Sequence, residues 1–337
     1  MKILVIEARG LHLGFLGCYG NEWIATPNLD RLAAEGVVLD RHYHNCPGAS
    51  QSRVSQVSMT TIRLENVAHF GQTALDAHRN AQADVLWIDG PDLAPPWKLP
   101  VDLRDVYFDE DEVDAEPWLD PPCDVVGELS TAELLELHNT YAAVVTWFDA
   151  QLGVLLDGLR AAGALDEMLL CVTASAGLPL GEHGVIGPAR AWLHEELVHV
   201  PLVMRLPNRQ FAGLRVGALT QPADLARTIE EFASPARSAS KGGESLACAA
   251  GWSDVARPYA CCHLQIGDSV EWALRAPEWA FLLPIRVPNG DAPRGPQLYA
   301  KPGDRWEVND VRQHHLELAD EFGQTLRKLM QESEPRP

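Results

Sequence analysis

Short apolar runs recur along the first two thirds of the chain, separated by longer stretches in which apolar residues are spaced three or four apart. A run of four to eight apolar residues bounded by turn-forming residues is typical of a strand that is buried on both faces of a sheet. Four such runs predict strands, at residues 2–7, 84–89, 168–174 and 200–207.

Two of the intervening stretches predict helices. Residues 26–36 place Thr26 at an N-cap, Pro27 at the first helical position and Gly36 at the end. In residues 130–163, Ser130 and Glu133 have the spacing of a capping box, and a continuous apolar stripe follows.

This alternation predicts an α/β fold, in which a mostly parallel central sheet is sandwiched by helices. After residue 208 the pattern changes to a short helix, short alternating strands and a closing amphipathic helix. We therefore expect an N-terminal α/β domain over 1–208 and a small C-terminal α+β subdomain over 209–337.

Chemistry in such a fold gathers beyond the C-terminal ends of the strands. Four loops are expected to meet there, at residues 8–21, 45–53, 90–98 and 175–192.

The net charge of the chain argues against anionic macromolecules as partners. The chain has 27 Lys and Arg against 47 Asp and Glu, a formal net charge of −20. Nucleic acids and anionic membrane surfaces bind positive faces, so neither is expected as a partner.

The start of the chain reads as a strand rather than a signal peptide, and no continuous apolar run is long enough to span a bilayer. The seven cysteines are scattered and lack the spacing of a zinc site. These features predict a cytoplasmic protein without disulfides.

Several segments resemble the sulfatase family of the alkaline phosphatase superfamily. The first is "LGCYGNEWIATPNLDRLAAEGVVLDRHYHNCPGASQSR", and the resemblance continues in "YAAVVTWFDAQLGVLLDGLRAAGALDEMLLCVTASAGLPLGEHG" and "WLHEELVHVPLVMRLP". Near the C-terminus, "LRAPEWAFLLP" and "QLYAKPGDRWEVND" are similar to the small subdomain of that family.

The resemblance implies hydrolysis of sulfuric esters by a bound calcium ion and by a Cys or Ser that is oxidised to formylglycine. The nucleophile position falls on Ala49, whose methyl group cannot be oxidised in that way. Gln51 replaces the family's proline, Ser52 and Arg53 match, and the usual histidine of the proline-rich loop falls on Ala94.

The family's metal ligands follow the first strand and the strand at 168–174. Those positions hold Arg9 and Gly10 in the first case, and Ser175 and Ala176 in the second. Calcium prefers six to eight oxygen ligands, several of them carboxylates, so we predict neither calcium nor formylglycine as a cofactor.

Two interpretations of the cationic residues stay open. In one, Arg9 and Arg53, with Ser50, Ser52 and Ser175, line a remnant pocket for an anionic or sulfated small molecule. In the other, Arg9 pairs with Glu7, Asp89, Asp92 or Glu182 and only fills the place of the metal, and Ser52 caps a helix.

Other reactive side chains have structural interpretations beside the functional ones. His42 and His44 could share a face of a strand as metal ligands. We expect Glu182 and His183 to stabilise a loop by hydrogen bonds. In "HEELVH" we expect His194, Glu195 and Glu196 to be a helix start or an acidic support rather than a zinc-binding motif. We expect the Cys18 thiol to be a packing group, and the register of the loop argues against Cys46 as a replacement nucleophile.

The sequence thus predicts a sulfatase-like protein that is catalytically inactive, with no catalytic residue at Ala49 or Ala94. It would bind an anionic ligand, or act as a scaffold for an active relative or for itself. The alternative is an active sulfuric or phosphoric ester hydrolase that uses other residues.

Overall fold

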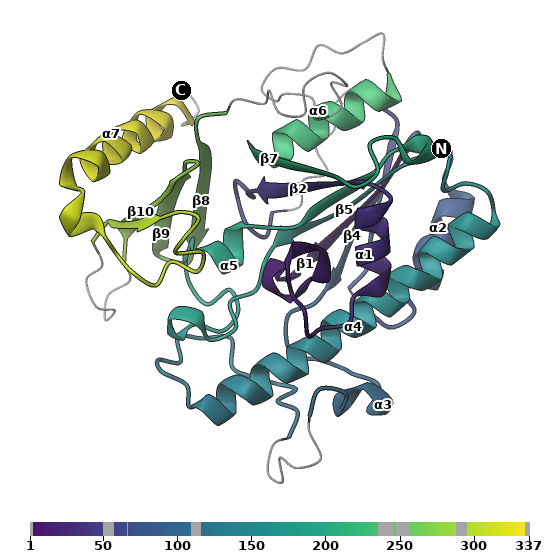
Figure 1. The fold of residues 1–337 in the computed structure, drawn as a ribbon, viewed down its shortest axis with the longest axis horizontal. Helices are drawn as coiled ribbons and strands as arrows, with labels where there is room; N and C mark the ends of the chain where they lie inside the picture. Colours follow the sequence, from purple (N-terminus) through teal and green to yellow (C-terminus); the bar gives the residue numbers. More distant parts are fainter. Residues whose placement is uncertain are drawn as a thin grey trace.

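Two sheets organise the computed structural model, which describes residues 3–49, 57–65, 67–108, 116–234, 246, 257–287 and 295–333 (Figure 1). The larger sheet has seven strands in the order β3-β4-β1-β5-β6-β2-β7, and the smaller has four in the order β11-β10-β9-β8. The large-sheet strands are β1 (Ile3–Arg9), β2 (Val37–His42), β3 (Met59–Arg63), β4 (Val85–Asp92), β5 (Leu169–Ala176), β6 (Leu202–Arg205) and β7 (Leu214–Thr220).

The large sheet is mostly parallel, as the alternation of strands and helices predicted. Its exception is β6, which runs antiparallel to both β5 and β2. The four predicted strands are confirmed as β1, β4, β5 and β6, with ends shifted by a few residues.

Helices cover both faces of this sheet because its central strands are apolar on both sides. On one face α1 (Pro27–Ala34), α2 (Phe70–Asn80) and α4 (Thr131–Ala161) pack on the main core, while α6 (Pro222–Ala233) covers the other face (Figure 1). Strand β1 shows the division clearly, because Leu4 and Ile6 belong to the first core and Ile3 and Val5 to the second.

The long helix α4 confirms the sequence prediction. Ser130 caps it: the Ser130 hydroxyl accepts from the Glu133 N–H, and the Glu133 carboxylate accepts from the Ser130 N–H in return. By length and composition α4 could also cross a membrane. Most of its apolar stretch is buried against the sheet, which is what the core helix of a globular fold requires.

Helix α1 departs from the expected capping. Thr26 holds the N-cap position, but its hydroxyl makes no capping bond. It instead accepts from the Gly17 N–H at 3.0 Å, so it ties the preceding loop to the helix. Glu35 is the C-cap, one residue before Gly36.

The C-terminal sheet is antiparallel, as expected. Its strands are β8 (Ala260–Ile266), β9 (Ser269–Arg275), β10 (Trp279–Arg286) and β11 (Gln297–Ala300), and α7 (Leu316–Ser333) covers its outer face. The remaining short elements are α3 (Val101–Arg104), α5 (Glu195–Val198) and five 3-10 turns, η1 (Leu13–Phe15), η2 (Gly17–Tyr19), η3 (Glu182–Gly184), η4 (Pro207–Arg209) and η5 (Arg312–His314).

The predicted domain boundary at 208/209 cuts the large sheet too early. Strand β7 pairs in parallel with β2, and Leu225 and Ile229 of α6 lie in the core beneath that sheet. Both elements lie beyond residue 208 and belong to the larger layer. The smaller sheet begins only at Ala260, so the division between the layers falls after α6.

Candidate functional site

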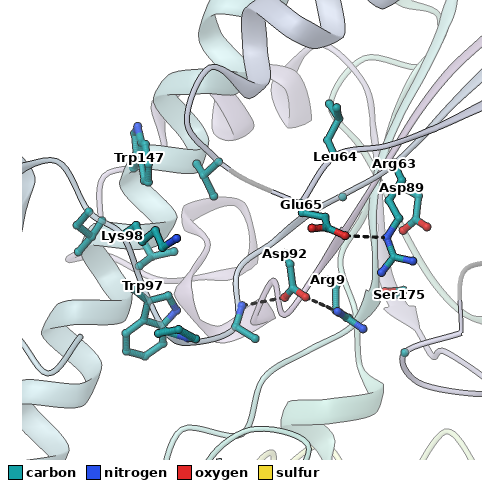
Figure 2. Close-up of a pocket in the computed structure, with 17 residues that line it drawn as sticks. Arg9, Arg63, Leu64, Glu65, Asp89, Asp92, Trp97, Lys98, Trp147 and Ser175 are labelled. Atoms are coloured by element: carbon teal, nitrogen blue, oxygen red, sulfur yellow. Dashed lines mark hydrogen bonds and ion pairs between the residues drawn. The ribbon is translucent and has the colours of Figure 1, made fainter. Parts of the chain in front are cut away.

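A pocket of about 620 Å³ opens where the C-terminal ends of β3, β4, β1 and β5 meet (Figure 2). Its wall combines charged side chains with two tryptophans and several apolar residues. The lining residues are Arg9, Gly48, Arg63, Leu64, Glu65, Val67, Asp89, Gly90, Asp92, Ala94, Pro96, Trp97, Lys98, Leu99, Val144, Trp147 and Ser175.

The four positions of the family's metal ligands lie together at the edge of this pocket. Strands β1 and β5 are neighbours, and Arg9 stands opposite Ala176 in their register. The Gly10 N–H donates to the Ala176 carbonyl at 2.9 Å. The residue counting from the sequence therefore leads to a single place in the fold.

The loop that carries the nucleophile position reaches the same place. The Gly48 N–H donates to the Ser175 carbonyl at 2.9 Å, and Gly48 lines the pocket. The next residue, Ala49, is exposed. Ser50, Ser52 and Arg53 lie outside the described residues.

Arg9 forms an ion pair with Asp92 across the pocket floor (Figure 2). Its Nε and Nη2 both donate to Oδ2 of Asp92, the former at 2.8 Å, while Oδ1 of Asp92 accepts from the Ala94 N–H at 3.0 Å. The Arg9 side chain stays 46% exposed. Asp92 was one of four acids that the sequence offered as a partner for Arg9.

Four further charged groups in the wall were not identified as site residues from the sequence. Arg63 and Glu65 follow β3 and approach one another, with Nε and Oε1 3.8 Å apart. Asp89 and Lys98 have no side-chain hydrogen bond or ion pair within the part of the chain that the structure describes. In the sequence, the only sign that Asp89 and Lys98 line the pocket is that each lies at or beside a loop that follows a predicted strand.

Two aromatic side chains form the apolar wall. Trp97 is buried, and its Nε1 donates to the Leu93 carbonyl at 2.8 Å, which fixes the ring. Trp147 comes from α4 and is partly buried against the main core. Trp147 lies beside the apolar stripe of α4, so its position on the helix gave no signal of a pocket.

The donor set at the strand ends does not fit a calcium ion. Calcium needs several anionic oxygens, and Arg9, Gly10, Ser175 and Ala176 supply one hydroxyl and a guanidinium. The Asp92 carboxylate beside Arg9 is already bonded to the Arg9 guanidinium.

The candidate thiols are packing groups. Burial raises the pKa of Cys18 to about 12, and burial also raises the pKa of Cys46. Neither thiol forms the thiolate that a nucleophile requires at neutral pH. The six described cysteines are free thiols.

The imidazoles of His42 and His44 serve local structure. Nδ1 of His42 lies 2.9 Å from the Thr220 hydroxyl, and Nδ1 of His44 accepts from the Cys46 N–H at 3.3 Å. Burial lowers the pKa of each histidine to about 3. Within the described residues, no group of three or more His, Cys, Asp or Glu is arranged to hold a metal.

A second group of charges lies between the two sheets, and we call it the inter-sheet ion cluster. It is buried and joins α5 to the C-terminal sheet and to the loop after β11. Its members are His194, Glu195, His199, Arg275, Lys301 and Glu307.

Most charges in the inter-sheet ion cluster have close partners. Glu307 lies 3.0 Å from Arg275 and 3.1 Å from both Lys301 and His194. Glu195 lies 2.6 Å from His199 and 3.0 Å from Lys301. His199 and Lys301 hold the pKa of Glu195 well below its usual value despite burial.

Glu196, beside this cluster, is different. Both of its carboxyl oxygens are buried without a hydrogen bond from the described residues, and His183 is 4.0 Å away. Burial, together with the nearby Glu182, raises the pKa of Glu196 well above its usual value.

Glu182 and His183 stabilise their loop as predicted: Glu182 accepts from the Leu180 N–H, and Nε2 of His183 lies 3.0 Å from the Trp306 carbonyl. "HEELVH" does start a helix, α5.

Solved structures with this fold cover nearly the whole chain. The protein BT4656, solved with its substrate D-glucosamine-2-N,6-O-disulfate, matches with a TM-score of 0.70 over 99% of both chains at 16% identity. The phosphonate monoester hydrolase of Agrobacterium radiobacter matches with a TM-score of 0.72 over 98% of this chain and 95% of that one, at 14% identity. At such identities the likeness shows the fold alone.

Sequence relatives match over shorter segments. An N-acetylglucosamine-6-O-sulfatase of Bacteroides thetaiotaomicron is 34% identical over 93 residues, which is 28% of this chain and 16% of that protein. The steryl-sulfatase of Mus musculus is 50% identical over 54 residues, 16% of this chain and 9% of that protein. The matched segments thus span only a small part of these relatives.

A sequence model of the whole family gives broader coverage. The sulfatase model matches residues 65–234, just over half of the 337 residues. This range includes strands β4, β5, β6 and β7 of the large sheet but not β1, β2 or β3. This match agrees with the architecture and with the quoted segments, and the chain therefore belongs to the sulfatase family.

Proposed function

We propose that this chain is a sulfatase-family protein that binds an anionic small molecule in the strand-end pocket and does not cleave it by the formylglycine and calcium chemistry. The observation that supports this most is the position of Arg9. A guanidinium stands where the family pattern places a metal ligand, and its ion pair with Asp92 occupies the carboxylate beside it.

The pocket retains groups that suit an anion. Nε and Nη2 of Arg9 share one oxygen of Asp92, so its Nη1 has no hydrogen bond to a described residue. Lys98 is exposed at the opposite wall and has no described partner. Each of these two cations can donate charge-assisted hydrogen bonds to a sulfate or a carboxylate.

The remainder of the pocket suits an organic body on that anion. Trp97 and Trp147 offer aromatic surface, and Glu65 and Asp89 offer acceptors for hydroxyl groups. A sulfated sugar combines these features, and it is the ligand class that we propose.

Thermal unfolding with sulfate and with sulfated monosaccharides tests the proposal. A bound ligand at roughly 100 times its Kd stabilises the folded state by about 2.7 kcal/mol. We expect this stabilisation to be lost in Arg9→Ala and weakened in Lys98→Ala. Arg79→Ala, which removes an exposed cation on α2, is the matched control and should behave as the wild type.

An assay of aryl sulfate and aryl phosphate hydrolysis separates binding from catalysis. We expect no turnover above a heat-treated control. Turnover that depends on Asp89 or Asp92 would favour an active hydrolase with other catalytic groups. Stabilisation that is equal in the wild type and Arg9→Ala would exclude Arg9 as the anion anchor.

A further inference from the structure

One border of the large sheet is an open strand. Strand β3 is the end member of the sheet, and no described strand pairs with its outer side. It pairs with β4 in an unbroken parallel register from Met59↔Val85 to Arg63↔Asp89.

The hydrogen bonds to β4 show which backbone groups face outward. The Val85 N–H donates to the Ser58 carbonyl, and the Leu64 N–H donates to the Asp89 carbonyl. In a parallel ladder alternate residues bond the same neighbour, so the even-numbered residues face β4. Met59, Thr61 and Arg63 therefore direct their N–H and C=O groups to the open side.

The other sheet borders are covered or irregular among the described residues. The His263 N–H on β8 donates to the Asn45 carbonyl at 2.8 Å, and the Leu298 N–H on β11 donates to Asp310 at 3.0 Å. Strand β7 contains Gly217, and its pairing with β2 is interrupted by a register shift.

Strand β3 also lacks the usual features that prevent edge pairing. It has no proline and no register shift, and its residues Thr60, Thr61 and Ile62 favour β structure. Thr60 and Thr61 are exposed. In a chain of net charge −20, residues 57–64 contain a single charge, that of Arg63.

We propose that β3 pairs antiparallel with β3 of a second copy, about a two-fold axis at Thr61. In this register Thr61 faces Thr61, and Met59 faces Arg63 of the second copy. All three are the outward-bonding residues, so each strand offers three N–H and three C=O groups to the other. No like charges stand opposite one another.

The pairing also places the second copy beside the pocket. Arg63 and Glu65 line the pocket at the end of β3, and their side chains are 65% and 83% exposed. In the paired register, residues 57 and 58 of the second copy pass beside Leu64 and Glu65.

Sedimentation over a concentration series tests this interface. A five-residue strand pair is small, so we expect a concentration-dependent dimer of the wild-type chain. Thr61→Pro removes an outward N–H without affecting the ladder to β4, and should raise the dimer dissociation constant roughly ten- to thirty-fold. Thr61→Val keeps the N–H and should dimerise as the wild type.

Charge variants test the register itself. Thr61→Lys and Thr61→Asp each place like charges on the two-fold axis, and each alone should be monomeric. An equimolar mixture of the two should recover the dimer. A wild-type chain that keeps the mass of one copy throughout the series would overturn the proposal. So would a Thr61→Pro chain that dimerises normally, or a mixture that stays monomeric.

Discussion

The pocket and the inter-sheet ion cluster use the same kinds of side chain in opposite ways. In the pocket, the pairs Arg9–Asp92 and Arg63–Glu65 reach solvent. In the cluster, Glu307 and Arg275 are almost fully buried. Water screens the first group, while protein partners alone compensate the charges of the second.

The buried cluster and the exposed pocket also differ in how closely their residues resemble the sulfatase family. The cluster lies in segments that resemble the family, "WLHEELVHVPLVMRLP", "LRAPEWAFLLP" and "QLYAKPGDRWEVND". The pocket holds the positions that depart from it. We infer that the cluster holds the two sheets together, whereas the exposed ion pairs of the pocket contribute little to stability.

Glu307→Ala should give the largest effect. It leaves Arg275 and Lys301 buried without their shared carboxylate, and we expect a loss of about 3–5 kcal/mol in the free energy of unfolding. Urea denaturation measures this loss. Glu307→Gln, which keeps the shape but not the charge, should lose less. A loss below about 1 kcal/mol would show that the cluster is no more important than a surface pair.

Glu196→Gln should stabilise the protein in a pH-dependent way. The folded state keeps Glu196 protonated above the unfolded pKa of 4.5, so the unfolded state binds fewer protons there. The wild type then loses about 1.4 kcal/mol of stability per pH unit, from pH 4.5 up to the folded pKa.

The Glu196→Gln variant does not lose stability in this way, because glutamine does not titrate. The two stabilities should agree near pH 4 and separate as the pH rises, which denaturation at several pH values will show. Parallel curves for the two proteins would mean that Glu196 does not titrate as inferred.

Asp92→Asn tests the exposed ion pair of the pocket in the same way. Removing an exposed ion pair should change the free energy of unfolding by no more than about 1 kcal/mol. Because Arg9 is then no longer neutralised, sulfate should bind more tightly. Calorimetric titration with sulfate checks this, and weaker binding would indicate that Asp92 orients Arg9 for the ligand.

Ala49→Cys should have the smallest effect. The change restores an oxidisable group at the nucleophile position, but Arg9 and Gly10 still stand at the ends of β1. Even when the variant is produced with the formylglycine-generating enzyme, aryl sulfate turnover should stay at background. Recovery of turnover by this single change would contradict the assignment of the metal positions.

Sequence alone predicted the layers well because the periodic apolar runs determine them. Strand β1 and helix α4 follow directly from an apolar run and from a capped stripe. The boundary at residue 208 was wrong because β7, "LRVGALT", has few large apolar residues and gains its place only by pairing with β2.

The site was predictable only where family positions could be counted. The meeting of Arg9 with Ala176 follows from strand order, and Asp92 was among the partners considered for Arg9. Arg63, Lys98 and Trp147 could not be identified, because their approach depends on how β3, the proline-rich loop and α4 pack. Such contacts between distant segments leave no local pattern.

The calcium content of the purified chain, equilibrated with calcium and then freed of unbound ion, tests the central claim most directly. The ligand set at Arg9, Gly10, Ser175 and Ala176 predicts no stoichiometric calcium. One calcium per chain, lost in Ser175→Ala or in Asp89→Asn, would contradict the claim. It would indicate that the pocket is a calcium site that can support metal-assisted ester hydrolysis.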